Sequence, residues 1–267
     1  MIKYETISSE VKDHVCIIKL NRAQVHNAFN PVMILELTSE FLNQSTNAST
    51  RVIILTGQGK SFSAGADLAY MQSSKDFTMV ENQEDARNLE KLFHTIYQTP
   101  KPIIGRINGA AFGGGVGLVS LCDISIAVER AIFAFSEVNL GIMPAVISPY
   151  VIPKIGMSQA TRYFLTGERF STETALKIGL IHEIAPSISE LDQKLDEIVI
   201  HLLASGPIAM AQIKRILDKN RTETLDVLRP YLIDSIARIR TSPEGKEGLN
   251  AFLEKRDPKW KVKTWSK

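Results

Sequence analysis

Short apolar runs alternate with longer amphipathic stretches up to about residue 185 of the chain. The apolar runs are rich in β-branched residues, which predicts buried strands; they cover residues 15–20, 52–56, 103–107, 124–128 and 181–184. The stretches between them space their apolar residues as amphipathic helices do. Strands that alternate with helices favour an α/β fold in which right-handed crossovers join parallel strands.

Capping signals indicate where several helices begin. Asn30 precedes Pro31, a pair that suits the N-cap and the first turn of a helix. Residues 205–207 (SGP) and 242–244 (SPE) are similar starts in the last third, where the pattern is helical almost to the end. Residues 75–83 are polar, and we expect a mobile connection there. The helical last third can cover the core or contact a neighbouring subunit.

The stretch INGAAFGGGVG, residues 107–117, follows a predicted strand and leads into an apolar run. Consecutive glycines at positions 113–115 let the backbone approach a ligand closely, because no Cβ atom intervenes. If a helix begins there, its first N–H groups form a site for an anion, or for a carbonyl oxygen that gains negative charge. A tight turn or a close-packing point would also explain the glycines.

Two phosphate-binding motifs do not fit this stretch. A P-loop requires Lys and then Ser or Thr after its last glycine, but Gly115 and Val116 follow Gly114. The dinucleotide fingerprint GxGxxG, counted from Gly113, ends at Leu118 instead of glycine. The glycines therefore favour an oxyanion site over a nucleotide-phosphate cradle.

Two further features can belong to the same site. The stretch SFSAGADLAYM at 61–71 crowds small residues after another predicted strand, so it can present one more exposed backbone N–H group. Glu137 stands out because its neighbours, among them Phe135 and Val138, are apolar. A buried carboxylate beside an oxyanion site would have a raised pKa and could transfer protons. A solvated acid at the end of a strand is the alternative for Glu137.

Composition and charge exclude several classes of protein. The chain has 267 residues, of which 44% are hydrophobic and 22% charged, as in an ordinary globular enzyme. The net charge of +2 gives no argument for nucleic-acid binding. No apolar stretch reaches about 18 residues, so we expect no membrane span. The N-terminus lacks a signal-peptide core, so we expect a cytoplasmic location. No histidine or cysteine has metal-ligand spacing, and we expect no metal site.

Several segments together resemble the crotonase family, which is the enoyl-CoA hydratase/isomerase family. They are LNRAQVHNAFN at 20–30, SFSAGADLAYM at 61–71, INGAAFGGGVGLVSLCDISIA at 107–127, FAFSEVNLGIMPA at 133–145, TRYFLTGERFSTETALKIGLI at 161–181 and EGLNAFLEKRDPKW at 247–260. The combination spans essentially the whole chain and is more specific than any one segment. GGGVGL together with MPAVISPY at 143–150 also resembles the bacterial methylglutaconyl-CoA hydratase-type members, which act in leucine breakdown.

This resemblance implies a fold, an assembly and a substrate. We expect a crotonase-like spiral of ββα turns over residues 1–200, and a helical C-terminal region over 201–267 that serves in trimerisation or as a lid. The family usually forms homotrimers or dimers of trimers. Its substrates are acyl-CoA thioesters, so coenzyme A is part of the substrate and we expect no separate cofactor. We expect neither a nucleic-acid partner nor a membrane partner.

The resemblance also implies the residues of the site. The backbone N–H groups of Ala66 and Gly114 would hold the thioester oxygen and stabilise the enolate that forms. Glu137 matches the glutamate with which the family transfers protons. The expected contacts with substrate or CoA are Ala64, Gly65, Asp67, Leu68, Gly113, Phe252 and Lys255.

Gly117 is a departure from the family, because classical hydratases carry another glutamate at that position. General acid–base groups contribute about 10²–10⁴ in rate, so the loss must be compensated or the reaction must differ. We hypothesise that Gly117 removes a charge that would repel a branched enoyl-CoA with a distal carboxylate, and leaves volume for its branch. The carboxylate of such a substrate could then help to position water.

Several functions therefore remain open. The first is hydration of a 2-enoyl-CoA, such as 3-methylglutaconyl-CoA, with Glu137 as the acid/base. The second is a Δ3,Δ2-enoyl-CoA isomerase that shuttles a proton with Glu137 alone. Another crotonase-family reaction, such as thioester hydrolysis, is the third. RNA binding is a fourth, because one eukaryotic relative has it; the chain lacks the Lys-rich helix of that relative between Pro31 and Thr50, and its charge is near neutral.

Overall fold

The computed structural model describes residues 3–262 and 265. Within those residues, a six-stranded sheet has the order β1-β2-β3-β4-β6-β9, and a three-stranded sheet has the order β5-β7-β8. The strands are β1 (Ile7–Lys12), β2 (Val15–Leu20), β3 (Val52–Gly57), β4 (Ile103–Ile107), β5 (Ala111–Phe112), β6 (Ile124–Val128), β7 (Ile132–Ala134), β8 (Phe170–Ser171) and β9 (Glu183–Ala185).

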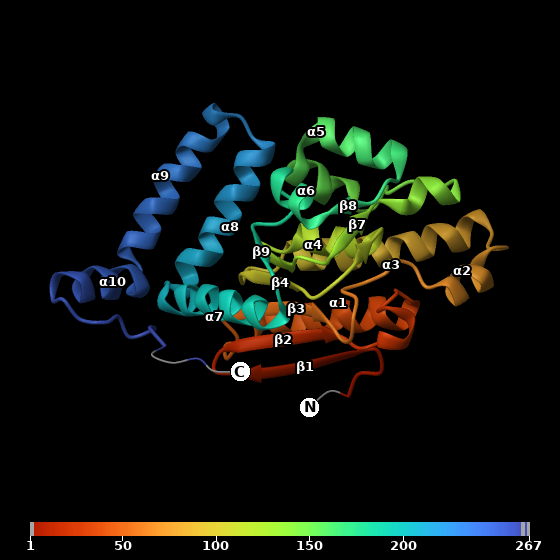
Figure 1. Ribbon diagram of the computed structural model, residues 1–267. Helices are drawn as coiled ribbons and strands as arrows, with labels where there is room; N and C mark the ends of the chain where they lie inside the picture. The colour runs from red at the N-terminus through yellow and green to blue at the C-terminus, as the bar shows by residue number, and fades with distance from the viewer. Residues whose placement is uncertain (1–2, 263–264, 266–267) are drawn as a thin grey trace.

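Helices pack along the larger sheet and continue beyond it, while β1 and β2 form its free lower edge in the view (Figure 1). The helices that precede β9 are η1 (Ala23–Val25), α1 (Pro31–Thr46), α2 (Leu68–Ser74), α3 (Met79–Tyr97), α4 (Gly114–Leu121), η2 (Ser136–Leu140), α5 (Ser148–Thr166) and α6 (Thr172–Lys177). The chain ends with α7 (Ile188–Ala204), α8 (Pro207–Thr222), α9 (Leu225–Thr241) and α10 (Pro243–Leu253). In Figure 1, α8 and α9 form a hairpin at one side of the molecule, while α2 lies at the opposite side.

The larger sheet confirms the predicted α/β class. Strands β2, β3, β4, β6 and β9 pair in parallel, and among the described residues β1, at the edge, is the only strand of this sheet that pairs antiparallel. Every residue of β3 is buried, as a central strand covered on both faces requires. Helix α1 begins as predicted, because the Asn30 side chain accepts a hydrogen bond from the Met33 N–H and Pro31 occupies the first turn.

Two boundaries differ from the prediction. Residues 79–83 are helical rather than part of a mobile connection, because Thr78 and Glu81 form a reciprocal capping box that starts α3. The last strand of the larger sheet begins at Glu183, two residues later than expected. The predicted division at residue 200 falls inside α7, and it stays a prediction. None of the described helices is long and apolar enough to cross a membrane.

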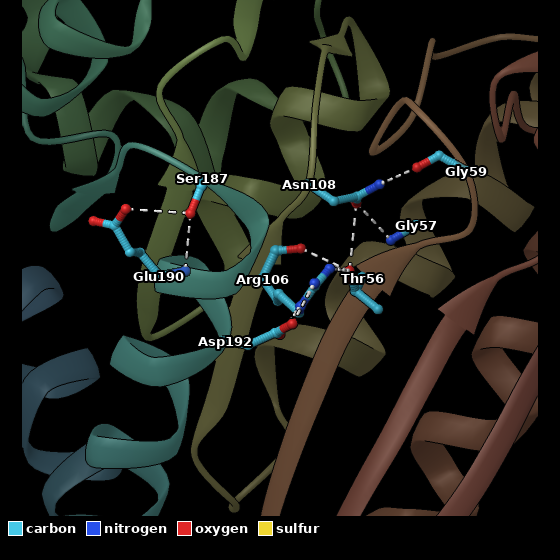
Figure 2. Close-up of polar contacts among 8 residues, drawn as sticks. All are labelled: Thr56, Gly57, Gly59, Arg106, Asn108, Ser187, Glu190 and Asp192. Atoms are coloured by element: carbon cyan, nitrogen blue, oxygen red, sulfur yellow. Dashed lines mark hydrogen bonds and ion pairs between the residues drawn. The ribbon is translucent and has the colours of Figure 1, made fainter. Parts of the chain in front are cut away.

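A polar cluster joins β3, β4 and α7 where β3 and β4 end (Figure 2). Arg106 on β4 pairs with Asp192 on α7, with 2.7 Å between Nε and Oδ1. The Thr56 hydroxyl donates to the Arg106 carbonyl oxygen at 2.8 Å. The two glycine-containing stretches singled out in the sequence leave the sheet at this point, so the cluster fixes where both begin.

Candidate active site

Two buried asparagines hold the loop that leads from β3 into the stretch at residues 61–71. The Asn108 Oδ1 atom accepts from the Gly57 N–H at 3.1 Å, and its Nδ2 donates to the Gly59 carbonyl oxygen at 3.0 Å (Figure 2). From the other side, Asn27 Nδ2 donates to the carbonyl oxygens of Ser61 and Phe62, at 3.0 and 3.1 Å. The sequence did not identify these positioning residues, since a buried asparagine in a turn leaves no distinctive pattern.

The stretches at residues 61–71 and 107–117 then run side by side. The Phe112 N–H donates to the Ser63 carbonyl oxygen at 2.9 Å. A Cβ atom built on Gly65 would lie 3.6 Å from the Gly114 nitrogen. The structure therefore brings together the segments of Ala66 and Gly114, as the resemblance implied.

Both N–H groups expected to hold an oxyanion are available. Phe29 donates to the Gly65 carbonyl oxygen at 2.6 Å and accepts from the Asp67 N–H at 2.9 Å, so the Ala66 N–H points away from Phe29. Gly114 is the first residue of α4, and its N–H has no place in the helical ladder. Within the described residues, neither N–H group has a hydrogen-bond acceptor in the protein. Free, preorganised donors of this kind stabilise a developing oxyanion.

The consecutive glycines are required for different physical reasons. Gly113 has a φ of +51°, a conformation that side chains rarely adopt. A Cβ atom on Gly114 would lie 2.7 Å from Cε2 of Phe29, and one on Gly115 would lie 2.5 Å from the Ser63 carbonyl oxygen. These glycines therefore serve both as close-packing points and as an accessible helix start, so the packing interpretation and the oxyanion-site interpretation of this stretch are compatible.

Glu137 lies next to the same loop. It belongs to η2, just after β7, and the Gly113 N–H donates to the Ala134 carbonyl oxygen of that strand at 2.9 Å. Its Oε2 atom is buried, and no described group donates a hydrogen bond to it. Burial raises the pKa of the Glu137 carboxyl, although a hydrogen bond from its own backbone acts in the opposite direction. The Glu137 side chain is half-buried with its Oε2 atom shielded from solvent, which favours the enclosed acid over a fully solvated one, and its role in proton transfer stays a prediction.

The expected free volume at Gly117 is occupied. Gly117 lies one turn after Gly113 on α4, and a Cβ atom built on it would lie 2.5 Å both from Cγ2 of Ile147 and from Cε1 of Phe93. Both of those side chains are buried, and the Phe93 ring stacks on Tyr150 with 6.0 Å between centroids. An apolar wall therefore stands where classical hydratases carry a glutamate, and the hypothesis that Gly117 leaves volume for a substrate branch is wrong.

Asp67 and Leu68, two of the predicted substrate contacts, differ in their surroundings. Asp67 Oδ2 pairs with Arg22 at 2.7 Å, and Oδ1 caps α2 by accepting from the N–H groups of Ala69 and Tyr70. Burial would raise the pKa of Asp67, but these hydrogen bonds and the Arg22 charge lower it overall. Its carboxylate thus supports the loop that contains Ala66. Leu68 is 80% exposed at the start of α2. Contacts of both residues with CoA stay predictions.

Phe252 and Lys255 lie far from this site within one chain. Phe252 belongs to α10 and Lys255 lies just after it, and Figure 1 places this helix at the side of the molecule opposite α2. Phe252 is 81% exposed. One chain does not bring these two residues to Ala66 and Gly114. Among the described residues, no group of His, Cys, Asp and Glu side chains could hold a metal ion.

Comparisons with known proteins agree with this geometry. The sequence family described as Enoyl-CoA hydratase/isomerase matches residues 10–263. The chain is 31% identical to crotonyl-CoA hydratase from Syntrophomonas wolfei, covering 95% of the chain and 96% of the relative. It is also 31% identical to 2,3-dehydroadipyl-CoA hydratase from Escherichia coli, covering 94% and 96%. The crystal structure of an enoyl-CoA hydratase from Shewanella pealeana superposes with a TM-score of 0.93 at 40% identity, covering 97% of both chains, which confirms the expected fold.

Proposed function

Because the chain belongs to the enoyl-CoA hydratase/isomerase family, we propose that it adds water across the double bond of a 2-enoyl-CoA thioester. The observation that carries this proposal is the half-buried carboxyl of Glu137, with its Oε2 shielded from solvent, near the free N–H groups of Ala66 and Gly114. The relatives named as hydratases of crotonyl-CoA and 2,3-dehydroadipyl-CoA support the reaction type.

The reaction can proceed with one carboxylate. Glu137 takes a proton from water as the water oxygen bonds to C3, and the electrons of the double bond move to the thioester oxygen. The N–H groups of Ala66 and Gly114 stabilise the enolate formed. Glu137 then returns the proton to C2, so that one water molecule has been added. The raised pKa of Glu137 suits this exchange, since it brings the carboxyl nearer to the working pH.

We propose a substrate that carries its own distal carboxylate, such as 3-methylglutaconyl-CoA. Gly117 removes a negative charge from the helix face next to Glu137, so an acidic substrate meets less repulsion there. The E. coli relative is named for an enoyl-CoA of a dicarboxylic acid. The wall of Phe93 and Ile147 means that the methyl branch has to lie elsewhere than above Gly117.

Isomerisation of a 3-enoyl-CoA is the second candidate, and the same wall favours it. Phe93 and Ile147 give the attacking water no polar partner beside Gly117. An isomerase needs none, because Glu137 removes a proton from C2 and returns it to C4.

Product analysis tests the proposal and separates the two candidates. The enzyme is incubated in ¹⁸O-labelled water with 3-methylglutaconyl-CoA and, separately, with a 3-enoyl-CoA. Hydration predicts a 3-hydroxyacyl-CoA that carries ¹⁸O from the first substrate. Conversion of the 3-enoyl-CoA to its 2-enoyl isomer, with no labelled hydroxyl from either substrate, would replace hydratase by isomerase.

We further propose a homotrimer, or a dimer of trimers, in which Lys255 and Phe252 contact the CoA bound to a neighbouring subunit. The separation of α10 from α2 within one chain supports this arrangement. Exposed apolar side chains on α8 and α9, such as Leu217, Ile233 and Ile236, are suited to a subunit interface.

A further inference from the structure

The far end of α4 contacts a half-buried lysine that the proposed chemistry does not use. Lys154, on α5, donates a hydrogen bond from Nζ to the carbonyl oxygen of Cys122, which caps the C-terminal end of α4. Gly114 is the first residue of the same helix. A rise of 1.5 Å per residue places the ammonium about 12 Å from the N–H group that would hold the enolate oxygen.

Among the described residues, no carboxylate lies within ion-pair distance of the Lys154 ammonium, although Asp123 still acts on its charge. Within the described residues Lys154 forms no ion pair, whereas the nearby Asp123 pairs with Lys214 at 2.7 Å. Asp123 also accepts from the Ile103 N–H at 2.7 Å, so its carboxylate is already engaged. Lys154 lines a cavity of about 560 Å³ between α3, α4, α5 and α8. The titratable and charged groups around it are Cys122, Asp123, His182 and Lys214, and further along the cavity Tyr97, Tyr150, Arg215, Asp218 and Arg221.

We propose that Lys154 is a positioning residue for the oxyanion site, which acts through α4. Its ammonium fixes the last carbonyl of the helix and offsets the negative end of the helix dipole, so that the potential at the Gly114 N–H becomes more positive. A charge that the protein partly encloses is felt at this distance because the surroundings screen it less than water does. The inference rests on the proposed enolate chemistry, which both the hydratase and the isomerase require.

The first test separates kcat from KM. Lys154→Met should lower kcat about three- to tenfold and change KM less than twofold, because the effect falls on the enolate and not on CoA binding. Lys154→Arg, which keeps the charge, should retain most of the activity. Lys177→Met is the matched control: Lys177 is exposed on α6, and its loss should leave kcat unchanged. A kcat for Lys154→Met within twofold of the parent would overturn the proposal.

A pH profile distinguishes electrostatics from a merely structural role. Burial lowers the pKa of Lys154, although Cys122 and Asp123 act against this. In the parent, kcat should therefore fall at alkaline pH below the titration of an ordinary lysine, while Lys154→Arg keeps its charge and should lack that fall. Identical alkaline profiles for the parent and Lys154→Arg would contradict the proposal, and this comparison holds even if Lys154→Met does not fold. If the parent enzyme only isomerises 3-enoyl-CoA, the proposed hydratase function is contradicted. The same Lys154 variants then test the role of Lys154 in the isomerisation reaction.

Discussion

Gly113 and Glu137 lie so close that a Cβ atom at position 113 would stand 3.1 Å from Oε1 of Glu137. The same glycine has a φ of +51° and directs the chain into α4, whose first N–H belongs to Gly114. One residue therefore sets both the oxyanion donor and the space for the acid/base. This coupling predicts that a side chain at position 113 disturbs both groups.

Gly113→Ala should lower kcat about 10²–10³-fold, the range seen when an oxyanion donor is lost. The new Cβ atom forces an unfavourable φ and presses on the Glu137 carboxylate, so both functions suffer together. Steady-state kinetics with crotonyl-CoA measures the effect. Gly156→Ala is the matched control, because Gly156 also has a positive φ, of +76°, but nothing lies within 4 Å of its Cβ position. Equal losses of activity in the two variants would indicate strain alone.

Glu137→Gln should stabilise the fold at neutral pH. The pKa of Glu137 is raised in the folded protein. Its carboxyl therefore contributes favourably to the free energy of unfolding below the pKa of the unfolded chain, and this contribution is lost as the pH rises through the pKa of the folded protein. Glutamine stays neutral, so the Tm of the variant should exceed that of the parent at pH 7, and the difference should shrink toward about pH 4. The control Glu129→Gln changes an exposed acid and should show no such trend. A constant difference at every pH would contradict the burial of the Glu137 charge.

Gly117→Glu should not restore a classical two-glutamate site. The new side chain meets Phe93 and Ile147 at once, so urea unfolding should show a loss of about 1–3 kcal/mol from overpacking. Hydration of 3-methylglutaconyl-CoA should not improve. Combining Gly117→Glu with Ile147→Ala should recover part of the lost stability, because it removes one of the two contacts. Faster hydration by the single variant would refute the account of this wall.

Lys255→Ala should raise KM about tenfold for crotonyl-CoA, if its ammonium meets a CoA phosphate, and leave kcat unchanged. The matched substrate is the crotonyl thioester of pantetheine, which lacks the nucleotide, and its KM should not respond. Lys259→Ala removes another exposed lysine of the same region as a control. An unchanged KM for crotonyl-CoA would remove Lys255 from the proposed CoA site.

Strands β2, β3, β4 and β6 were predictable because their apolar, β-branched runs are distinct in the sequence. Strand β1 was not, since only Ile7 of its residues is buried at this sheet edge. The strands β5 and β8 have two residues each, too few for a pattern. The first turn of α3 had a readable signal, the Thr78–Glu81 capping box, but its polar composition hid it.

The sequence predicted only those residues of the candidate site that lie in recognisable motifs. Ala66, Gly114 and Glu137 stand in recognisable stretches, and the structure places them together. The wall over Gly117 was not predictable, because Phe93 and Ile147 come from segments distant in the sequence whose approach depends on helix packing. The link between Lys154 and α4 is hidden for the same reason.

The measurement that tests the central claim most directly is the loss of conjugated enoyl-thioester absorbance, with crotonyl-CoA and 3-methylglutaconyl-CoA, in the parent and in Glu137→Gln. The account predicts faster hydration of the branched acid by the parent, and a fall of about 10²–10⁴-fold in the variant, the usual contribution of a general acid–base group. Hydration that survives the substitution would contradict the role of Glu137, and no hydration of either substrate by the parent would contradict the hydratase itself.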